Sequence, residues 1–281
     1  MPLDQVDIDE LDMGQSKKKE MSFIDHLEEL RWMILRSLLA IVLCTIAVFA
    51  FKGFFIETVI FGPSTPEFVG YEIICNFSQK VLKGDKLCFS NTISMQNPKM
   101  VGQFLTHFKM SFVMGFVLAF PFVFWQVWKF IRPALYKNEL TAMRGIVFFA
   151  WFFFIIGIMF GYFLILPFSM NFLANYILSD NIQNLNTIGD YTGFITMVSL
   201  GAGLMFELPM VIYMLAKIGL VTPKFLRKYR KHAVVILLFV AAMITPPDVI
   251  TQILIGLPVY LLYELSIFVA AWVQKKQPSN G

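Results

Sequence analysis

Long runs of apolar residues recur along this chain, and the run over 145–166 carries no charged side chain at all. A helix needs about 20 consecutive apolar residues to cross the hydrocarbon core of a bilayer. The sequence offers six candidate runs, at about 33–51, 105–129, 145–166, 191–217, 233–245 and 250–273. These runs predict an all-α integral membrane protein with six transmembrane helices, the last two of them short.

The composition argues against a water-soluble protein. Hydrophobic residues make up 57% of the chain and charged residues 15%, whereas soluble domains typically contain about 25% charged residues. Too few polar residues remain to cover a surface in water, so the lipid bilayer is the natural solvent for the excess apolar side chains. The net charge of +4 gives no reason to expect a nucleic-acid partner.

The fifth and sixth runs are separated by the Pro-Pro-Asp-Val sequence at 246–249. The two prolines forbid one continuous helix, so the pattern predicts a tight hairpin. The fifth run would extend roughly 20 Å, against about 30 Å of hydrocarbon. We expect either a locally thinned bilayer, into which Arg230, Lys231 and His232 snorkel, or a helix a few residues longer than its apolar run.

The distribution of Lys and Arg predicts that both chain ends lie in the cytoplasm. Cytoplasmic loops accumulate these residues, and this orientation puts most of the 23 basic residues on that side. The second outer segment, 167–190, has no basic residue. The remaining basic residues lie between Lys52 and Lys109, in or beside one long outer loop at 52–104, and long loops weigh less in the rule.

The first residues resemble a tail rather than a targeting signal. Positions 1–16 contain five acidic residues and no basic one, whereas secretory signals begin with positive charge and transit peptides are rich in arginine. We expect a disordered cytosolic tail over 1–21, one membrane domain over 22–273 and a cytosolic tail over 274–281.

Two of the three cysteines, Cys75 and Cys88, fall in the long outer loop. On the oxidising side of a bacterial inner membrane they can form a disulfide. It would close a loop of about a dozen residues, which loop-entropy models value at about 3 kcal/mol. Two free thiols are the alternative. Cys44 lies inside the first run and is interpreted as a small apolar filler.

One carboxylate, Glu207, lies well inside the fourth run. A charged carboxylate that faces lipid costs at least a few kcal/mol, so Glu207 should be protonated, paired or in a wet cavity. A functional role and a structural hydrogen bond to another helix both fit. Pro209 removes a backbone hydrogen bond nearby and favours a bend, while Gly201 and Gly203 would let another backbone approach closely.

The other polar groups within the runs form no catalytic pattern. Gln252, Tyr260 and Glu264 are isolated positions in the sixth run, and for Gln252 and Glu264 we expect structural or gating roles. The three histidines are scattered along the chain, so a metal site has no support. No nucleophile–base set and no phosphate-binding loop occurs in the sequence. We expect neither an enzyme nor a cofactor.

A group of carboxylates, Asp25, Glu28 and Glu29, directly precedes the first run. They lie in a zone that usually accumulates Lys and Arg. Local pairing of Glu28 with Arg31, at i,i+3 spacing, is one explanation. A docking site for a basic ligand is another, because carboxylates bind guanidinium groups bidentately.

The first inner loop, 130–139, adds one more acid, Glu139, to the expected cytoplasmic face. Pro133 and Asn138 favour a structured turn in this loop over a continued helix. Taken by itself, the loop could equally be an ordinary solvated connection.

Together these segments resemble the TatC family, the large membrane subunit of the twin-arginine protein translocase. The resemblance covers essentially the whole chain after residue 22. Four segments carry it: His-Leu-Glu-Glu-Leu-Arg at 26–31, the loop at 130–139, Phe-Glu-Leu-Pro at 206–209 and Thr-Pro-Pro-Asp-Val at 245–249. Each is modestly specific alone, whereas four in this order on the expected faces of six spans are highly specific.

The resemblance implies the Sec-independent translocation of folded proteins across a bacterial cytoplasmic (inner) membrane. TatC-like proteins recognise signal peptides with paired arginines on the cytoplasmic face and act with small single-span partners of the TatA/TatB type. By motif match, Glu29 and Glu139 would contact the arginines, and Arg31 and Phe130 would shape the same surface. The family fold is a cupped bundle of helices, and self-association is left open.

The resemblance also implies three roles away from the signal peptide. Glu207 would face the interior of the cup and meet a polar group on a partner's span. Pro63 would lie in the outer cap that closes the cup, and Asp248 would mark the tight last outer turn. The chain departs from the family pattern where Met33 replaces a second basic residue two positions after Arg31. The outer loop at 52–104 is also longer than expected.

Two other classes of function explain part of the sequence. A proton- or ion-coupled small-solute transporter would use Glu207, but it should show inverted repeats with broken helices near the midplane. The two halves of this chain contain no matching pair of Gly- or Pro-broken runs. A passive assembly scaffold explains the spans but not the carboxylates at the cytoplasmic face.

Overall fold

The computed structural model of the chain describes residues 23–84, 88, 93–131, 142–179, 181, 185–245 and 249–276. Regular structure in these residues is helical, apart from one isolated bridge between Gln96 and Thr187. The predicted tail at 1–21, Glu139 and Asp248 lie outside the described residues, while the tail predicted from residue 274 is described only to Lys276, where it continues α10.

Five helical stretches in the described part of the chain are long and apolar enough to cross a membrane. They are His26–Ala50, Gly102–Ile131, Gly145–Asn175, Ile188–Lys217 and Ile250–Lys275. Each corresponds to one predicted run, because a bilayer demands an uninterrupted apolar stretch and the sequence supplies it. The prediction that the sixth span is short was wrong, since Ile250–Lys275 has 26 residues. The protein is therefore a helical membrane protein. The predicted fifth span corresponds to α9 (Arg230–Ile244), a helix of 15 residues.

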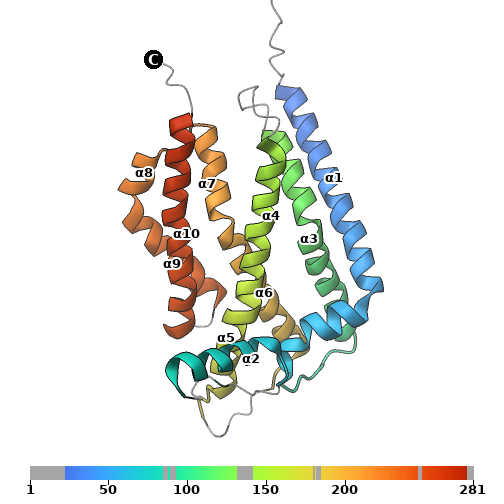
Figure 1. Cartoon of the computed structure of the whole chain (residues 1–281). Coiled ribbons are helices and arrows are strands. Elements are labelled where there is room, and N and C mark those ends of the chain that lie inside the picture. The colour runs from blue at the N-terminus through green and yellow to red at the C-terminus, as the bar shows by residue number, and fades with distance from the viewer. Residues whose placement is uncertain are drawn as a thin grey trace, which may run out of the picture.

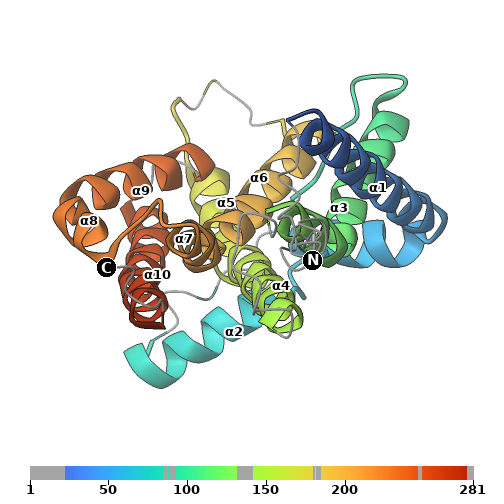
Figure 2. The same cartoon turned by 90° about the horizontal axis from the view of Figure 1, so that it is seen from above.

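The helices form an elongated arrangement (Figures 1 and 2). At one side α1 (Phe23–Ala50) packs on α3 (Gly102–Ile131), and at the other α7 (Leu208–Lys217), α8 (Pro223–Lys228) and α9 surround α10 (Val249–Lys276). Between them α4 (Ala142–Phe160), which continues through η6 (Gly161–Ile165) into α5 (Leu166–Asn175), packs on α6 (Ile188–Phe206). The start of α1 and the end of α10 lie at the same end, here called the terminal end.

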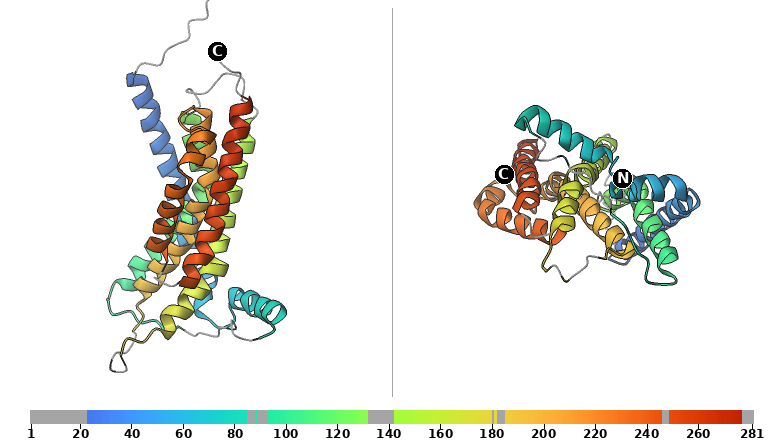
Figure 3. Two further views of the ribbon diagram at one scale, coloured as in Figure 1. Left: turned by 90° about the vertical axis from the view of Figure 1, so that its left-hand side faces the viewer. Right: turned by 90° about the horizontal axis from the view of Figure 1, so that it is seen from below.

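At the opposite end, the connection expected as a long outer loop over 52–104 contains short helices that were not predicted. Four helical segments occupy much of it: η2 (Gly53–Ile60), η3 (Gly62–Ser64), α2 (Val69–Phe77) and η4 (Ser78–Leu82). They lie crosswise under the spanning helices (Figures 1 and 3), and we call this region the cap. Each segment is too short to stand out by periodicity, and α2 is fixed by burying Tyr71 and Ile74.

Small residues bring the spanning helices into close contact. A Cβ atom added at Gly157 of α4 would lie 2.8 Å from the carbonyl oxygen of Ala202 and from the Cα of Gly203, both on α6. A Cβ atom at Gly115 of α3 would lie 2.7 Å from the backbone nitrogen of Thr45 on α1. Helices in lipid associate largely by such close packing, so these glycines hold the framework together.

Candidate functional site

A ring stack joins the start of α1 to the end of α3. The rings of His26 and Phe130 are parallel to within 19° and their centroids lie 4.4 Å apart. The stack brings the 26–31 segment beside the residue at which the first inner loop begins. The 26–31 segment and the first residue of the 130–139 segment, distant in the sequence, are therefore adjacent at the terminal end. No role for His26 was predicted from the sequence, and nothing local to this residue signals the contact.

The carboxylates beside this stack are accessible. Glu28, Glu29 and Arg31 are all exposed on the first turns of α1. The described residues include an ion pair elsewhere, between Arg230 and Glu264, but none between Glu28 and Arg31. Local pairing therefore does not explain these acids. One turn further along, the Arg36 guanidinium lies 5.9 Å from the centroid of the Trp32 ring.

The fourth span is interrupted at Glu207, as the prediction from Pro209 expects. Helix α6 ends at Phe206 and α7 begins at Leu208, with Glu207 between them. The backbone N–H of Glu207 donates to the carbonyl of Leu204 at 3.2 Å, a tighter turn than the α-helix makes. Pro209 has no N–H to donate, so the α-helical ladder cannot continue through this point.

The Glu207 side chain is buried without a partner. It is 5% exposed, and in the described part of the chain neither carboxylate oxygen has a hydrogen-bond partner. Of the three states expected for this acid, pairing within the described residues is excluded. A buried polar group that lacks a partner is costly, and such groups in native structures commonly serve a function. A partner helix can reach this carboxylate only if the surrounding helices move apart.

Two polar contacts tie the last two helices together. The Arg230 Nε lies 2.8 Å from one oxygen of Glu264, and its Nη2 donates to the other oxygen at 2.9 Å. Near the start of α10, the Gln252 side-chain amide donates to the carbonyl of Leu238 in the middle of α9 at 2.7 Å. Gln252 and Glu264, expected in structural or gating roles, both lie where α9 and α10 meet.

The cap is held by tyrosine hydroxyls that the sequence did not single out. Pro63 is buried in η3, and its carbonyl accepts a hydrogen bond of 2.9 Å from Tyr71. Burial raises the pKa of Tyr71 to about 12, so this hydroxyl stays protonated and can donate. Tyr191 of α6 donates to the carbonyl of Ile60 at 3.0 Å, and Tyr162 of η6 donates to that of Val59. Buried tyrosines usually need such partners, which is the signal that could have found them.

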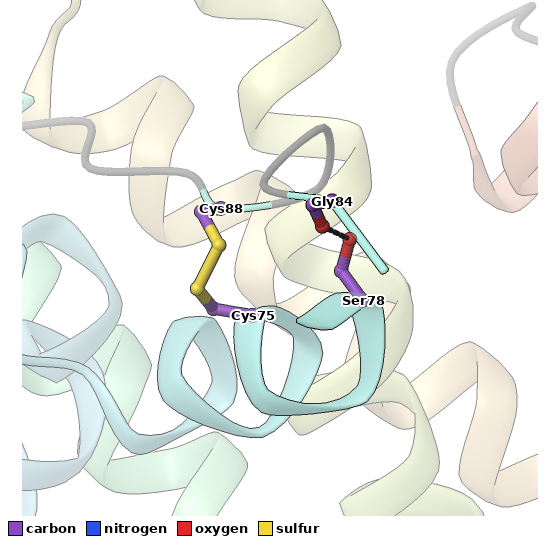
Figure 4. Close-up of a disulfide and its surroundings, with 4 residues drawn as sticks. All are labelled: Cys75, Ser78, Gly84 and Cys88. Carbon is purple, nitrogen blue, oxygen red and sulfur yellow. Dashed lines mark hydrogen bonds between the residues drawn. A yellow bond between two sulfur atoms is a disulfide. The ribbon is translucent and has the colours of Figure 1, made fainter. Parts of the chain in front are cut away.

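The disulfide predicted from the outer position of two cysteines is present. Cys75 of α2 and Cys88 are bonded, with their Cα atoms 4.4 Å apart. Figure 4 shows the bond beside a second closure of the same loop, in which the Ser78 hydroxyl donates to the Gly84 carbonyl at 2.6 Å. The disulfide thus fixes the end of α2 to the segment that follows it. Cys44 is a free cysteine in α1.

A cavity of about 280 Å³ lies between the cap and the first turns of α3 and α6. Its walls are mainly apolar and include Ile56, Phe61 and Met110, with His107 and Thr192 among the polar residues. The His107 ring stacks on Phe49 with 4.0 Å between centroids, and its Nε2 atom is buried without a partner in the described residues. The cavity marks where the cap covers the bundle.

Comparison with known proteins gives a consistent result. The family described as "Sec-independent protein translocase protein (TatC)" matches residues 25–258. The chain is 36% identical to the TatC protein of Blattabacterium sp. subsp. Periplaneta americana, over 94% of this chain and 100% of that one. It is 34% identical to the TatC protein of Desulforapulum autotrophicum, over 94% of this chain and 90% of that one.

Solved structures agree with the sequence matches. A crystal structure of the twin-arginine translocase receptor TatC in the detergent DDM superposes with a TM-score of 0.67 at 28% identity, over 87% of this chain and 99% of that one. A second crystal structure of a TatC receptor gives a TM-score of 0.63 at 28% identity, over 89% and 99% of the two chains.

Proposed function

The chain belongs to the TatC family of Sec-independent protein translocases, and we propose that it is the multi-span subunit of a twin-arginine translocase. In this role it recognises twin-arginine signal peptides on the cytoplasmic face of a bacterial inner membrane. Together with single-span partners of the TatA/TatB type, it moves folded proteins across that membrane. The family match over residues 25–258 supports this function directly.

The topology proposed for this function has six spans in a cupped bundle, with α9 as the short fifth span. Both tails, 1–21 and 274–281, would be cytoplasmic and flank one membrane domain over 22–273. The common position of the start of α1 and the end of α10 supports this orientation (Figure 1), as do the basic residues near that end. The terminal end is then cytoplasmic, and the cap with its disulfide faces the oxidising side.

The signal-peptide site is proposed at the terminal end. The observation that carries it is the stack of His26 on Phe130, which joins the acidic start of α1 to the first residue of the inner loop. Glu29, and Glu139 in the adjoining loop, would bind the two guanidinium groups, while Arg31 and Phe130 shape the surface. Charge-assisted hydrogen bonds contribute about 1.5–3 kcal/mol each when partly shielded from water, against about 0–1 kcal/mol for a fully exposed pair.

Glu207 is the proposed contact for a partner's span. It is a buried carboxyl group at the interruption between α6 and α7 and has no hydrogen-bond partner in the described residues. A polar group on an incoming helix would supply the missing bond, so association with the partner would relieve an existing penalty. Because the side chain is covered in the isolated chain, capture would involve displacement of neighbouring helices.

Photocrosslinking tests the receptor function. A photoreactive phenylalanine derivative at Phe130 should crosslink to a signal peptide with paired arginines and much less to one with paired lysines, because lysine cannot bind a carboxylate bidentately. The same residue at Phe77, exposed on α2 of the cap, is the matched control and should give no crosslink. Equal yields at both positions, or with both peptides, would rule out this site.

A further inference from the structure

The segment that links α7 to α9 concentrates positive charge on the surface. Between Glu207 and Asp248 the sequence contains no acidic residue. It contains six basic ones: Lys217, Lys224, Arg227, Lys228, Arg230 and Lys231. Arg230 is paired with Glu264, and Lys217 lies at the end of α7. Four exposed cations remain on α8 and the first turn of α9, here called the α8 cluster: Lys224, Arg227, Lys228 and Lys231.

Two side-chain bonds fix the height of this cluster along α10. The Tyr263 hydroxyl donates to the carbonyl of Leu226 in α8 at 2.9 Å, and Glu264 holds Arg230 at the start of α9. Helix α10 continues from this point to Lys276. At 1.5 Å per residue the cluster therefore lies about 18 Å short of the end of α10. Figure 1 shows α8 beside the upper part of α10, below its end, and α9 running down from α8 along α10.

The part of α10 beyond this level is built to contact hydrocarbon. Leu265, Phe268 and Trp272 are exposed and follow one another at helical spacing on one face. Lipid on that flank must extend almost to the end of α10, whereas on the other flank cations begin about 18 Å lower. A flat bilayer surface would leave the α8 cluster at the depth of acyl chains, where Lys and Arg are strongly disfavoured. The lipid surface must therefore descend at α8.

The residues around the α8 cluster suit a ligand that has a charged headgroup and apolar tails. Phe225 and Tyr229 are exposed between the cations, with ring centroids 4.6 Å apart, and aromatic residues of this kind favour the headgroup zone. Directly below, on α9, the exposed side chains of Val235, Ile236 and Phe239 offer an apolar surface for acyl chains. Cations above an apolar face match the phosphate and tails of a lipid better than they match a soluble acidic peptide.

We propose that the α8 cluster binds the headgroups of anionic phospholipids and draws the cytoplasmic leaflet down along α8 and α9. Arginine and lysine bind phosphate through charge-assisted hydrogen bonds, and basic residues close to an anionic leaflet attract it strongly. The assignment to the cytoplasmic leaflet rests on the topology of the proposed function. The binding itself depends only on the cluster and its depth beside α10.

Lipid retention gives the first test. The full chain is reconstituted into nanodiscs of equal phosphatidylglycerol and phosphatidylcholine, extracted gently and analysed by native mass spectrometry. In the test variant, all four residues of the α8 cluster are changed to Gln. The matched control changes four exposed lysines in and around the cap to Gln: Lys52, Lys80, Lys83 and Lys99. Arg230 is kept in both, so that its pair with Glu264 survives.

The wild type and the control should retain phosphatidylglycerol in preference to phosphatidylcholine. The test variant should bind phosphatidylglycerol at least about tenfold more weakly than the wild type does. Equal retention by wild type and test variant would overturn the proposal, as would an equal loss in the control. If the wild type retains both lipids alike but binds a polyglutamate peptide that the test variant does not, the surface belongs to an acidic protein segment and the proposal is wrong.

Depth gives the second test. Nitroxide labels are placed by F225C, K275C and F239C in turn, each in a C44A background in which the disulfide remains. A label at 225 should be as accessible to a water-soluble nickel chelate as one at 275. A label at 225 that is shielded from nickel and open to oxygen, like the label at 239, would contradict the proposal. Neither assay involves signal peptides, so failure here leaves the Phe130 crosslink intact, and failure of that crosslink leaves these results unchanged.

Discussion

The cap and the terminal end of the molecule are constructed in opposite ways. In the cap, the hydroxyls of Tyr162 and Tyr191 tie η2 to the spanning helices, the Tyr71 hydroxyl bonds α2 to η3, and a disulfide closes the end of α2. At the terminal end, α1 meets the end of α3 through one ring stack, and Glu28 and Glu29 stay exposed. In the cap, polar groups bond to other parts of the protein. At the terminal end, polar groups remain available to bind a ligand.

If this contrast is correct, reversing charge at the terminal end should remove function and leave stability unchanged. Glu139→Lys should reduce export of a twin-arginine reporter at least a hundredfold, and Glu29→Lys should reduce it less, because a lysine repels the incoming guanidinium groups. Export is measured with a folded reporter, and insertion by the amount of protein in the membrane. Glu72→Lys, exposed on α2 of the cap, is the control. Normal export by both variants would end the receptor assignment.

Removing the disulfide of the cap should have the opposite effect: it should lower stability and leave signal-peptide binding unchanged. Replacing Cys75 and Cys88 with Ser should lower the free energy of unfolding by about 3 kcal/mol, because the crosslink restricts the unfolded chain over a sequence separation of 13 residues. Denaturant unfolding in detergent measures the loss, and signal-peptide crosslinking at Phe130 should be unaffected. Cys44→Ala should cost much less. A cap whose unfolding is insensitive to reductant in the wild type would contradict this expectation.

Glu207 lies between these two regions and combines features of both: it is buried like the cap residues, but within the described part of the chain it has no partner, like the exposed acids. Glu207→Ala should weaken capture of a single-span partner at least about tenfold, while Glu207→Gln should keep much of it because an amide can still hydrogen-bond. Crosslinking yield to the partner helix measures both. Because no hydrogen bond within the described residues is lost and the side-chain volume is kept, Glu207→Gln should not destabilise the isolated chain. An unchanged yield for the Ala variant would remove the partner role.

The smallest expected effect is that of a single cap hydroxyl. Tyr71→Phe removes the bond to the Pro63 carbonyl and should cost about 1 kcal/mol of unfolding free energy. The pKa of Tyr71 is about 12 in the folded chain, against about 10 when unfolded. The contribution of the protonated hydroxyl is therefore complete below pH 10 and is lost as pH rises toward 12, a loss that the Phe variant should lack. Tyr229→Phe, at an exposed position, is the control.

The spanning helices were predictable because the bilayer imposes a length that the apolar runs must meet. The interruption at Glu207 was predictable because Pro209 cannot donate a backbone hydrogen bond. The helices of the cap were missed, since η2, α2 and η4 are short, and η2 is held by tyrosines that approach from η6 and α6. The hydroxyls of these tyrosines indicate that partners are needed, but no local pattern shows which carbonyls they reach.

Only part of the candidate site, likewise, could be predicted from the sequence. The carboxylates near the start of α1 stood out because acids are unusual beside a membrane span. Their position next to Phe130 did not, because it depends on how α1 packs against α3 over their whole length. The buried, unpartnered state of Glu207 likewise arises from the packing of several helices, so no pattern in its own segment could have distinguished it from a paired carboxylate.

The dependence of α1 on α3 also has a consequence in time. Helix α1 is covered mainly by α3, and it lies at the outer side of the bundle (Figure 2). The ribosome adds about 5–20 residues per second, so α1, complete at Ala50, waits several seconds before α3 is complete at Ile131. During synthesis α1 must persist as a lone helix in lipid. Its exposed residues Leu35, Leu39 and Leu43 suit that interval, which makes the first span a self-sufficient starting point for biogenesis.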